Sequence, residues 1–221
     1  MARRHDLELF LKSSEIFGRL PAKERQRLAG VSHERTFAKG ETIFHEGRPS
    51  DSVWLTLEGR VHLLHHQSGG RVQANCVMTP GETFCCLPAL DQGPYPATAV
   101  AATEARVLQI PTRLFHELMD QHPEMRRETL CFFSSRLRQV EERGCLVHDP
   151  VEHRIAQALL TLQKKFGDTI PLTRHEIAEL AGTTVETAIR TVSRFQQEGW
   201  LRSTRGKIQL LRPESLRQLL G

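Results

Sequence analysis

Glycines punctuate residues 36–110 and divide them into short runs of alternating apolar and polar residues. The glycines lie at positions 40, 47, 59, 69, 70 and 81, with runs such as VWLTL and RVHLL between them. Alternation of this kind places one face of a strand against a core, and glycine supplies the positive φ that tight turns require. The segment therefore predicts a small β-sandwich or barrel, and residues 7–30 before it predict one or two short helices.

The period of the apolar residues changes after Pro111. In residues 122–146 they recur at spacings of three and four, and arginine and glutamate fill the other faces. This heptad seam of about two repeats predicts a long helix that pairs with a second copy of itself. The alternative is a helix that packs only on its own β-domain, and Phe132 widens the apolar face enough for both. The predicted dimer contacts are Leu130, Phe133, Leu137 and Val140.

The sequence VHDP at residues 147–150 interrupts the helical pattern, because proline disfavours helical geometry at the residue before it. A domain boundary is expected there. The chain then has three parts: a β-domain over residues 1–120, a dimerisation helix with its hinge over 121–148, and a C-terminal unit over 149–221.

The net positive charge of the chain comes from the C-terminal unit. The whole chain has a net charge of +4, and residues 150–221 alone hold 11 Lys or Arg against 7 Asp or Glu. A basic unit joined to a neutral body indicates a polyanionic partner, and nucleic acid is the usual one. A merely solvated surface is the alternative.

The composition excludes several classes of protein. The chain is 39% hydrophobic and 25% charged, no stretch approaches 18 uncharged apolar residues, and the N-terminus has no apolar leader. An odd number of cysteines without regular spacing argues against a disulfide framework. We therefore expect a cytoplasmic protein without a membrane partner and with reduced thiols. The cysteines are Cys76, Cys85, Cys86, Cys131 and Cys145.

Two short helices separated by a glycine-containing turn are expected in residues 173–197. Thr173 and Glu176 have the spacing of a capping box, Gly182 closes the first helix, and Thr183 with Glu186 has the same spacing at the start of the second. This arrangement predicts a helix-turn-helix whose second helix enters the major groove of DNA.

The second helix carries two distinct faces. Ala188, Val192 and Phe195 predict its buried face, and Glu186 and Arg190 lie on the opposite one. Arginine can donate two hydrogen bonds to guanine, and a carboxylate can accept one from cytosine. Helix capping is the alternative role for Glu186. The predicted DNA-contacting residues are Thr184, Val185, Glu186, Thr187, Arg190, Ser193, Arg174 and Lys207.

A small hairpin is expected after Gly199, where WLRSTRGKIQLL alternates around a Thr-Arg-Gly-Lys turn. It forms the wing of a winged helix-turn-helix, with Arg202, Arg205 and Lys207 placed for phosphate contacts. A surface hairpin that merely carries three cations is the alternative. Pro213 begins a last helix.

The chain resembles the family of the cyclic-AMP receptor protein and the fumarate-nitrate reductase regulator (CRP/FNR). The resemblance runs from AKGETIFHEGRPSDSVWLTLEGRVHLL through TPGETF to LTRHEIAELAGTTVETAIRTVSRFQQEGWL. It implies an α+β fold with an N-terminal cyclic-nucleotide-binding-type β-roll (jelly roll), a long dimerisation helix and a C-terminal winged helix-turn-helix. It also implies a homodimer that binds a palindromic site in double-stranded DNA near promoters, with RNA polymerase as a further partner.

The resemblance also assigns roles to individual residues. Glu186 and Arg190 correspond to the pair that reads a G–C base pair in each half-site, and Asp149 to the family's hinge aspartate. Val185 matches the apolar residue of the fumarate-nitrate regulator branch. Ile189 departs from the serine of that branch, which leaves the half-site sequence open.

The sensor part departs from both branches. Members that bind cyclic AMP carry an Arg-Ser pair where this chain has GPYPATAVAA, with Tyr95 and Pro96 at that position and no cation between Arg71 and Arg106. A buried cyclic phosphate would lack its counter-charge, so cyclic AMP is not the expected effector. The first cysteine is Cys76, so the N-terminal cysteine cluster of the iron-sulfur branch is missing and such a cluster would need another set of ligands.

The stretch GETFCCLPAL resembles the site where the haem-containing carbon monoxide sensor of the family supplies a thiolate. Phe84 and Cys85 match that site, but the histidine expected two residues later is Leu87. Three interpretations stay open: a haem ligand, a redox-reactive thiol, or a structural buried cysteine. The substitutes considered for the missing histidine are His62, His65 and His66. The predicted effector-site residues are Cys85, Cys86, Glu82 and Tyr95, and the cofactor is left unknown, with haem as the one considered.

A cupin-like metal enzyme with a DNA-binding appendage is the remaining alternative. It would need histidines and Glu82 to converge in the barrel, but the spacing of His62 and His65 sends them to opposite faces of a strand. We therefore expect a regulator without catalytic residues and without a metal site.

Overall fold

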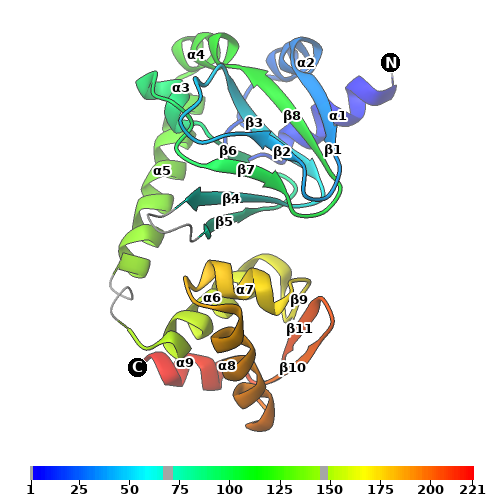
Figure 1. Cartoon of the computed structure of the whole chain (residues 1–221). Helices are drawn as coiled ribbons and strands as arrows, with labels where there is room; N and C mark the ends of the chain where they lie inside the picture. Colours follow the sequence, from blue (N-terminus) through cyan, green and yellow to red (C-terminus); the bar gives the residue numbers. More distant parts are fainter. Residues whose placement is uncertain (1, 67–71, 145–148) are drawn as a thin grey trace. The chain divides into compact units, whose positions relative to one another are not determined.

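The structure is a computed structural model that describes residues 2–66, 72–144 and 149–221 (Figure 1). The chain folds as two compact units, residues 1–65 with 75–138 and residues 66–74 with 139–221. No helix in the described part of the chain is both long and apolar enough to cross a bilayer.

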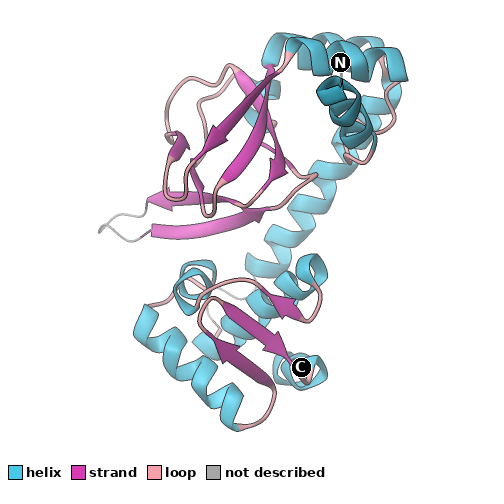
Figure 2. Cartoon of the chain, turned by 90° about the vertical axis from the view of Figure 1, so that its right-hand side faces the viewer, coloured by secondary structure: helices cyan, strands magenta, loops and turns pink. Residues whose placement is uncertain are grey.

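The N-terminal unit is a roll of two four-stranded sheets, and the strand pairings described for it are antiparallel (Figure 2). Between the sheets lies a core rich in aromatic residues, which includes Phe44, Trp54, Phe84 and Tyr95. The first sheet has the order β1 (His33–Phe37), β8 (Ala105–Pro111), β3 (Ser52–Glu58) and β6 (Thr83–Phe84). The second has the order β2 (Thr42–Phe44), β7 (Thr98–Ala101), β4 (Val61–His66) and β5 (Val72–Met78).

The turn between β3 and β4 shows why glycine punctuates this part of the chain. Gly59 has a φ of 75°, which side chains rarely adopt. A Cβ atom at this position would also lie 2.1 Å from the carbonyl oxygen of Glu104. Both the conformation and the close approach of the backbone therefore require glycine.

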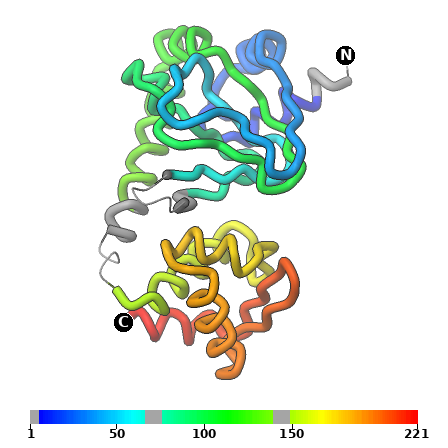
Figure 3. The backbone as a smooth tube through the Cα atoms, in the orientation of Figure 1, coloured from blue at the N-terminus to red at the C-terminus, as the bar shows by residue number. Residues whose placement is uncertain are grey.

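Helices of the same unit pack against β3 and β8 of the first sheet. A second core lies beneath them, where the rings of Phe17 and Phe115 meet edge to face with centroids 6.2 Å apart. The two helices expected before the strands are present, whereas the short helix α3 was not anticipated. Figure 3 traces the path of the chain through them. The helices are α1 (Ala2–Lys12), α2 (Ala22–Val31), α3 (Leu87–Asp91), α4 (Thr112–Gln121) and α5 (Pro123–Gly144).

The C-terminal unit packs its helices against a three-stranded sheet of order β10-β11-β9. The strands β10 and β11 form the expected hairpin, while β9 pairs with β11 and was not anticipated. The elements are α6 (Val151–Phe166), β9 (Thr169–Ile170), α7 (Arg174–Leu180), α8 (Val185–Gln197), β10 (Leu201–Thr204), β11 (Lys207–Leu210) and α9 (Pro213–Leu220). The fold class expected from the sequence is confirmed.

The hinge is only partly described. Residues 147 and 148 of VHDP lie outside the described residues, and Asp149 and Pro150 precede α6. Pro150 is the N-cap of α6 with a ψ of 142°, and its carbonyl accepts hydrogen bonds from the backbone N–H groups of His153 and Arg154. The proline thus begins the new helix.

Candidate DNA-binding interface and sensor

The helix α7 is fixed at its start by the capping box that the sequence predicts. The backbone N–H of Glu176 donates to the Thr173 hydroxyl over 3.2 Å, and the Thr173 N–H donates to the Glu176 carboxylate over 2.7 Å. Gly182, with a φ of 59°, then turns the chain toward α8. These local bonds set where the second helix begins.

The cap of α8 differs from the predicted one. The N-cap is Thr184, whose hydroxyl accepts from the N–H of Thr187 over 3.2 Å and lies 2.9 Å from the Thr187 hydroxyl. The expected capping box of Thr183 with Glu186 is therefore wrong, because the helix starts one residue later. Glu186 is left free of any capping role.

The two faces of α8 are divided as predicted. Ala188, Val192 and Phe195 are buried, and Glu186 and Arg190 are exposed. Among the remaining predicted contacts on this helix and its cap, Thr184 is exposed, and Val185, Thr187 and Ser193 are half-buried.

The charged residues of α8 differ in their partners. Arg194 pairs with Glu152 of α6 and with Glu198, and its guanidinium lies 5.4 Å from the centre of the Phe195 ring. Within the part of the chain that the structure describes, neither Glu186 nor Arg190 makes a side-chain hydrogen bond or ion pair. Arg194 therefore holds the helix in place, and Glu186 and Arg190 remain available to a partner.

The wing is held against α7 and α8 by polar contacts through Ser203. Arg174, at the start of α7, donates from Nε to the Ser203 hydroxyl over 3.0 Å. The Ser203 N–H donates to the side-chain oxygen of Gln196 on α8 over 2.8 Å. Lys207 is exposed beside the turn at Arg205 and Gly206, where Gly206 has a φ of 75°. The wing and the exposed face of α8 thus form one supported surface.

The predicted dimer seam lies on α5. Leu130 and Leu137 expose 68% and 60% of their surface. Phe133 is half-buried and packs partly against the core beneath the helices. The side chain of Val140 lies outside the described residues. Two leucines this exposed are large apolar groups without a cover in the single chain.

The two adjacent cysteines follow β6 directly. Cys85 and Cys86 are both buried, and Cys85 has a φ of 56°, a region that residues other than glycine rarely adopt. Burial raises the pKa of the Cys85 thiol to about 12, with a further contribution from Cys76. Burial also raises the pKa of Cys86. Near neutral pH both thiols are therefore protonated, which does not favour a thiolate role.

The residues around Cys85 decide whether a haem could be bound there. Cys85 lies in the core that contains the stacked rings of Phe44, Trp54, Phe84 and Tyr95. A porphyrin ligated by Cys85 would have to displace these rings, so the residues present do not fit the group.

The histidines considered as ligands in the sequence analysis do not form a cluster among the described residues. His62 is buried, His65 Nδ1 lies 3.4 Å from the Glu46 carboxylate, and the side chain of His66 lies outside the described residues. Among the residues that the structure describes, no group of three or more His, Cys, Asp or Glu is arranged to hold a metal ion.

Glu82 and Tyr95 have separate roles in the roll. Glu82 Oε2 accepts from the N–H and the hydroxyl of Thr79 over 2.7 Å each, and Glu82 Oε1 lies 3.4 Å from Arg136 of α5. Tyr95 is buried, and its hydroxyl accepts from Trp54 Nε1 over 3.1 Å. Burial raises the pKa of Tyr95. Of the four predicted effector residues, Tyr95 lines a cavity of about 490 Å³, and Cys85, Cys86 and Glu82 do not line it.

Two models of known protein families match this chain, one in each of its two parts. The model of the cyclic nucleotide-binding domain matches residues 34–122, and that of the Crp-like helix-turn-helix domain matches residues 153–219. The transcriptional activator protein FnrA of Stutzerimonas stutzeri is 30% identical over 200 residues, which cover 86% of this chain and 82% of FnrA. The chain belongs to the CRP/FNR family of transcription regulators.

Further relatives agree with this assignment. The CRP-like cAMP-activated global transcriptional regulator of Mycobacterium tuberculosis is 30% identical over 175 residues, 75% of this chain and 78% of its own. The structure of FixK2 from Bradyrhizobium japonicum shares the fold with a TM-score of 0.77 at 24% identity, over 86% of this chain and 98% of that one. This CRP/FNR member is thus a DNA-binding transcription regulator with an N-terminal sensor domain, and the relatives from Stutzerimonas stutzeri and Mycobacterium tuberculosis are named as transcriptional regulators.

Proposed function

We propose that this CRP/FNR protein is a homodimeric, sequence-specific transcription regulator in which α8 of each subunit reads one half of a two-fold symmetric DNA site. The observation that carries the proposal is the exposed pair of Glu186 and Arg190. Both side chains lack a partner among the described residues, while the next arginine on the helix is fully engaged. A charged pair left free on a rigidly capped helix suits an external ligand.

Base recognition follows from the chemistry of these two groups. Arg190 can donate two hydrogen bonds to O6 and N7 of guanine, and Glu186 can accept one from the amino group of cytosine. A glutamate that faces DNA without a base contact would repel the phosphates. The pair is therefore expected to read G–C base pairs, with Thr184, Val185, Thr187 and Ser193 beside it.

Phosphate contacts are assigned to the wing and to the start of α7. Lys207 is exposed beside the turn of the wing, as are Arg202 and Arg205, and Arg174 is tied to the wing through Ser203. Such contacts fix the position of the protein on the duplex and carry no sequence information. They also make affinity fall with salt, because each one releases counterions from the DNA.

The dimer is assigned to α5, where Leu130 and Leu137 lie two helical turns apart and are largely exposed. In a parallel pair of α5 helices these leucines would cover one another, with Phe133 and Val140 continuing the seam. We assign residues 1–120 to the sensor, 121–148 to the dimer helix with its hinge, and 149–221 to DNA binding. An effector would shift the dimer between states in which the two α8 helices do or do not lie one DNA turn apart, about 34 Å.

The signal is proposed to be something other than cyclic AMP, although one relative is named for its activation by that nucleotide. Residues 72–105 contain no lysine or arginine to balance a cyclic phosphate. The tyrosine at the matching position, Tyr95, is buried in the aromatic core instead. RNA polymerase is the proposed further partner, and the cytoplasm the proposed location.

Selection from a random library of DNA duplexes tests the proposed function. The full chain should enrich a two-fold symmetric motif whose half-sites are centred about 10 base pairs apart, with a G–C pair in each half. A motif without symmetry, or no enrichment over the input library, would contradict the proposal. Sedimentation of the protein with the selected duplex should show two subunits for each DNA molecule.

A further inference from the structure

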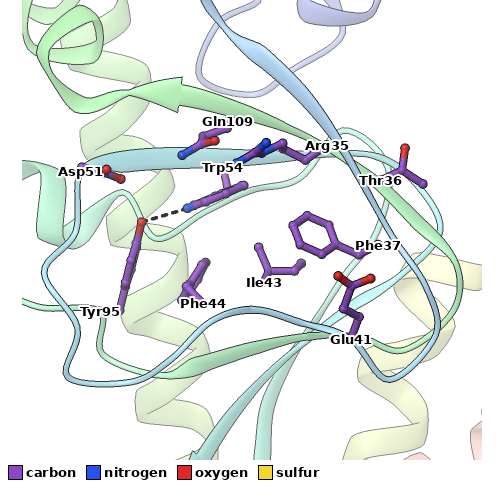
Figure 4. A pocket seen from close by; sticks show the side chains of 10 residues that line it. All are labelled: Arg35, Thr36, Phe37, Glu41, Ile43, Phe44, Asp51, Trp54, Tyr95 and Gln109. Atoms are coloured by element: carbon purple, nitrogen blue, oxygen red, sulfur yellow. Dashed lines mark hydrogen bonds between the residues drawn. The ribbon is translucent and has the colours of Figure 1, made fainter.

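A cavity of about 490 Å³ opens between the two sheets of the roll (Figure 4). Its walls come from β1, β2, β3 and β8, together with Glu41, Asp51 and Tyr95 from the connecting segments. The volume lies within the range of small-molecule sites in proteins, about 300 to 1,000 Å³. The cavity is thus large enough for a ligand of one or two rings.

The register of the first sheet explains why polar and aromatic side chains meet here. Trp54 of β3 pairs with Gln109 of β8, which also pairs with His33 of β1. Paired residues share a face, and so do residues two apart along a strand. Arg35 and Phe37 therefore lie on the same face of the sheet as Trp54 and Gln109, the face that looks into the cavity.

The aromatic wall consists of one stacked pair of rings and a third ring tilted against it. Phe44 and Tyr95 stack with centroids 3.9 Å apart and planes 15° apart, and Trp54 lies 5.7 Å from Phe44 at 37°. The hydrogen bond from Trp54 Nε1 to the Tyr95 hydroxyl locks two of these rings together. A flat aromatic guest can stack against such a wall or meet it edge to face.

The charged groups of the lining are one guanidinium, of Arg35, and two carboxylates, of Glu41 and Asp51. Arg35 is exposed and, among the described residues, makes no side-chain hydrogen bond or ion pair. The two carboxylates of the lining already have donors, since Glu41 accepts from the Ala38 N–H and Asp51 from the Ser52 hydroxyl, both over 2.8 Å. A guanidinium that is free beside an aromatic wall matches a carboxylate, which it can bind through two hydrogen bonds.

We propose that this cavity binds a planar aromatic carboxylate, with the ring against the wall of Phe44, Trp54 and Tyr95 and the carboxylate on Arg35. The proposal deepens the proposed function, on which it rests, by naming the chemical class of the effector. Trp54 belongs to β3 and Tyr95 to the segment that follows α3, so the cavity borders both parts of the roll.

The test uses a Trp200→Phe background, in which Trp54 is the one tryptophan left of the two in the chain. The full-length protein is titrated with trans-cinnamate and with its uncharged amide, and Trp54 fluorescence and the heat of binding are recorded. Cinnamate should bind saturably and about tenfold or more tighter than the amide, because a charged hydrogen-bonded pair is lost in the amide. Arg35→Gln should abolish that preference, while Arg113→Gln, an exposed arginine of α4 outside the cavity, should keep it.

Two results would overturn the inference: no saturable binding of cinnamate, benzoate or 2-naphthoate up to millimolar concentration, or the same preference for cinnamate in Arg35→Gln as in the parent. These binding measurements need no DNA. If the library selection fails but cinnamate binds, the proposed regulator function is wrong and the proposed binding site stands. If the selection succeeds but cinnamate does not bind, only the proposed binding site is wrong.

Discussion

Arg190 and Arg194 lie one turn apart on α8 and differ in what surrounds them. Arg194 is held by Glu152, Glu198 and the ring of Phe195, and Arg190 has no such partners among the described residues. A surface guanidinium with two carboxylates supports the helix, and one without them can bind an external acceptor. The difference separates a supporting arginine from the one proposed to read a base pair within a single helix.

The cysteines allow a prediction at the same scale. With iodoacetamide at pH 8, the exposed Cys131 should be alkylated within minutes, whereas Cys85 and Cys86 should stay unmodified until denaturant is added. The thiolate is the reactive form, and a thiol with a pKa of about 12 is about 0.01% ionised at pH 8. The rate at Cys85 should therefore rise with pH through the whole range up to about 12. Labelling of the native protein, mapped by mass spectrometry, checks this.

Rapid alkylation of Cys85 at pH 8, at the rate of Cys131, would contradict the buried and protonated thiol. It would instead restore the redox interpretation that the sequence left open. Denatured protein, in which all the cysteines react, is the matched control for the labelling chemistry.

Some of these residues could be placed from the sequence and others could not. The faces of α8 follow from helical spacing alone, so Glu186 and Arg190 were predicted to be exposed and are. The burial of Cys85 depends on which strands close over it, and the meeting of Arg35 with Trp54 depends on strand register. No local pattern encodes either one, although the alternation of Arg35 and Phe37 in ERTF was a visible signal that both share a face.

At the scale of elements, the cap of α8 gives a prediction that separates two neighbouring threonines. Thr184→Ala should lower the free energy of unfolding by about 1 kcal/mol, because it removes the acceptor for the Thr187 N–H. Thr183→Ala should change it by only a few tenths of a kcal/mol. Denaturant unfolding of the two variants measures both values, and the reverse order would show that the helix begins at the earlier threonine.

The wing gives a second prediction for an element. Lys207→Ala should weaken binding to all duplexes alike and reduce the slope of log affinity against log salt by roughly 2 for the dimer, one phosphate contact being lost in each subunit. Titrations of a labelled duplex at several salt concentrations measure the slope. Arg217→Ala, whose guanidinium is committed to Gln163, is the charge-matched control and should leave the slope unchanged.

The predicted dimer seam on α5 gives a third prediction for an element. A double variant, Leu130→Lys with Leu137→Lys, should raise the dissociation constant of the dimer at least about tenfold, because it places like charges where two leucines would meet. The control is Leu211→Lys in the other unit, which is also an exposed leucine. Equal sedimentation of both variants and the parent would place the dimer interface elsewhere.

The strands and helices of this chain were predictable to different degrees. Glycine-bounded alternation predicted a β-sandwich or barrel, the family resemblance implied a β-roll, and the heptad spacing predicted α5 within a few residues. The helix α3 is five residues long and carries no amphipathic pattern, and β9 consists of two residues that become a strand only by pairing with β11. Elements this short are specified by their tertiary neighbours rather than by their own sequence.

At the scale of the whole molecule, α5 is the proposed connection between the sensor and the DNA-binding unit. Arg136 of that helix lies 3.4 Å from Glu82 in the turn before β6, so a contact exists between the roll and the proposed dimer helix within the N-terminal unit. A ligand that reorders the roll has a physical route to α5 there. The fraction of dimers able to bind DNA would then depend on the difference in ligand affinity between the DNA-binding state and the other state of the dimer.

The central claim is that Arg190 reads a base pair in each half of a symmetric site, and a thermodynamic cycle tests it most directly. Binding free energies are measured for the parent and Arg190→Ala on the selected duplex and on one with the conserved G–C pair inverted in both half-sites. The account predicts that inversion costs the parent about 1 to 3 kcal/mol per half-site and costs Arg190→Ala almost nothing. An equal cost for both proteins would contradict it.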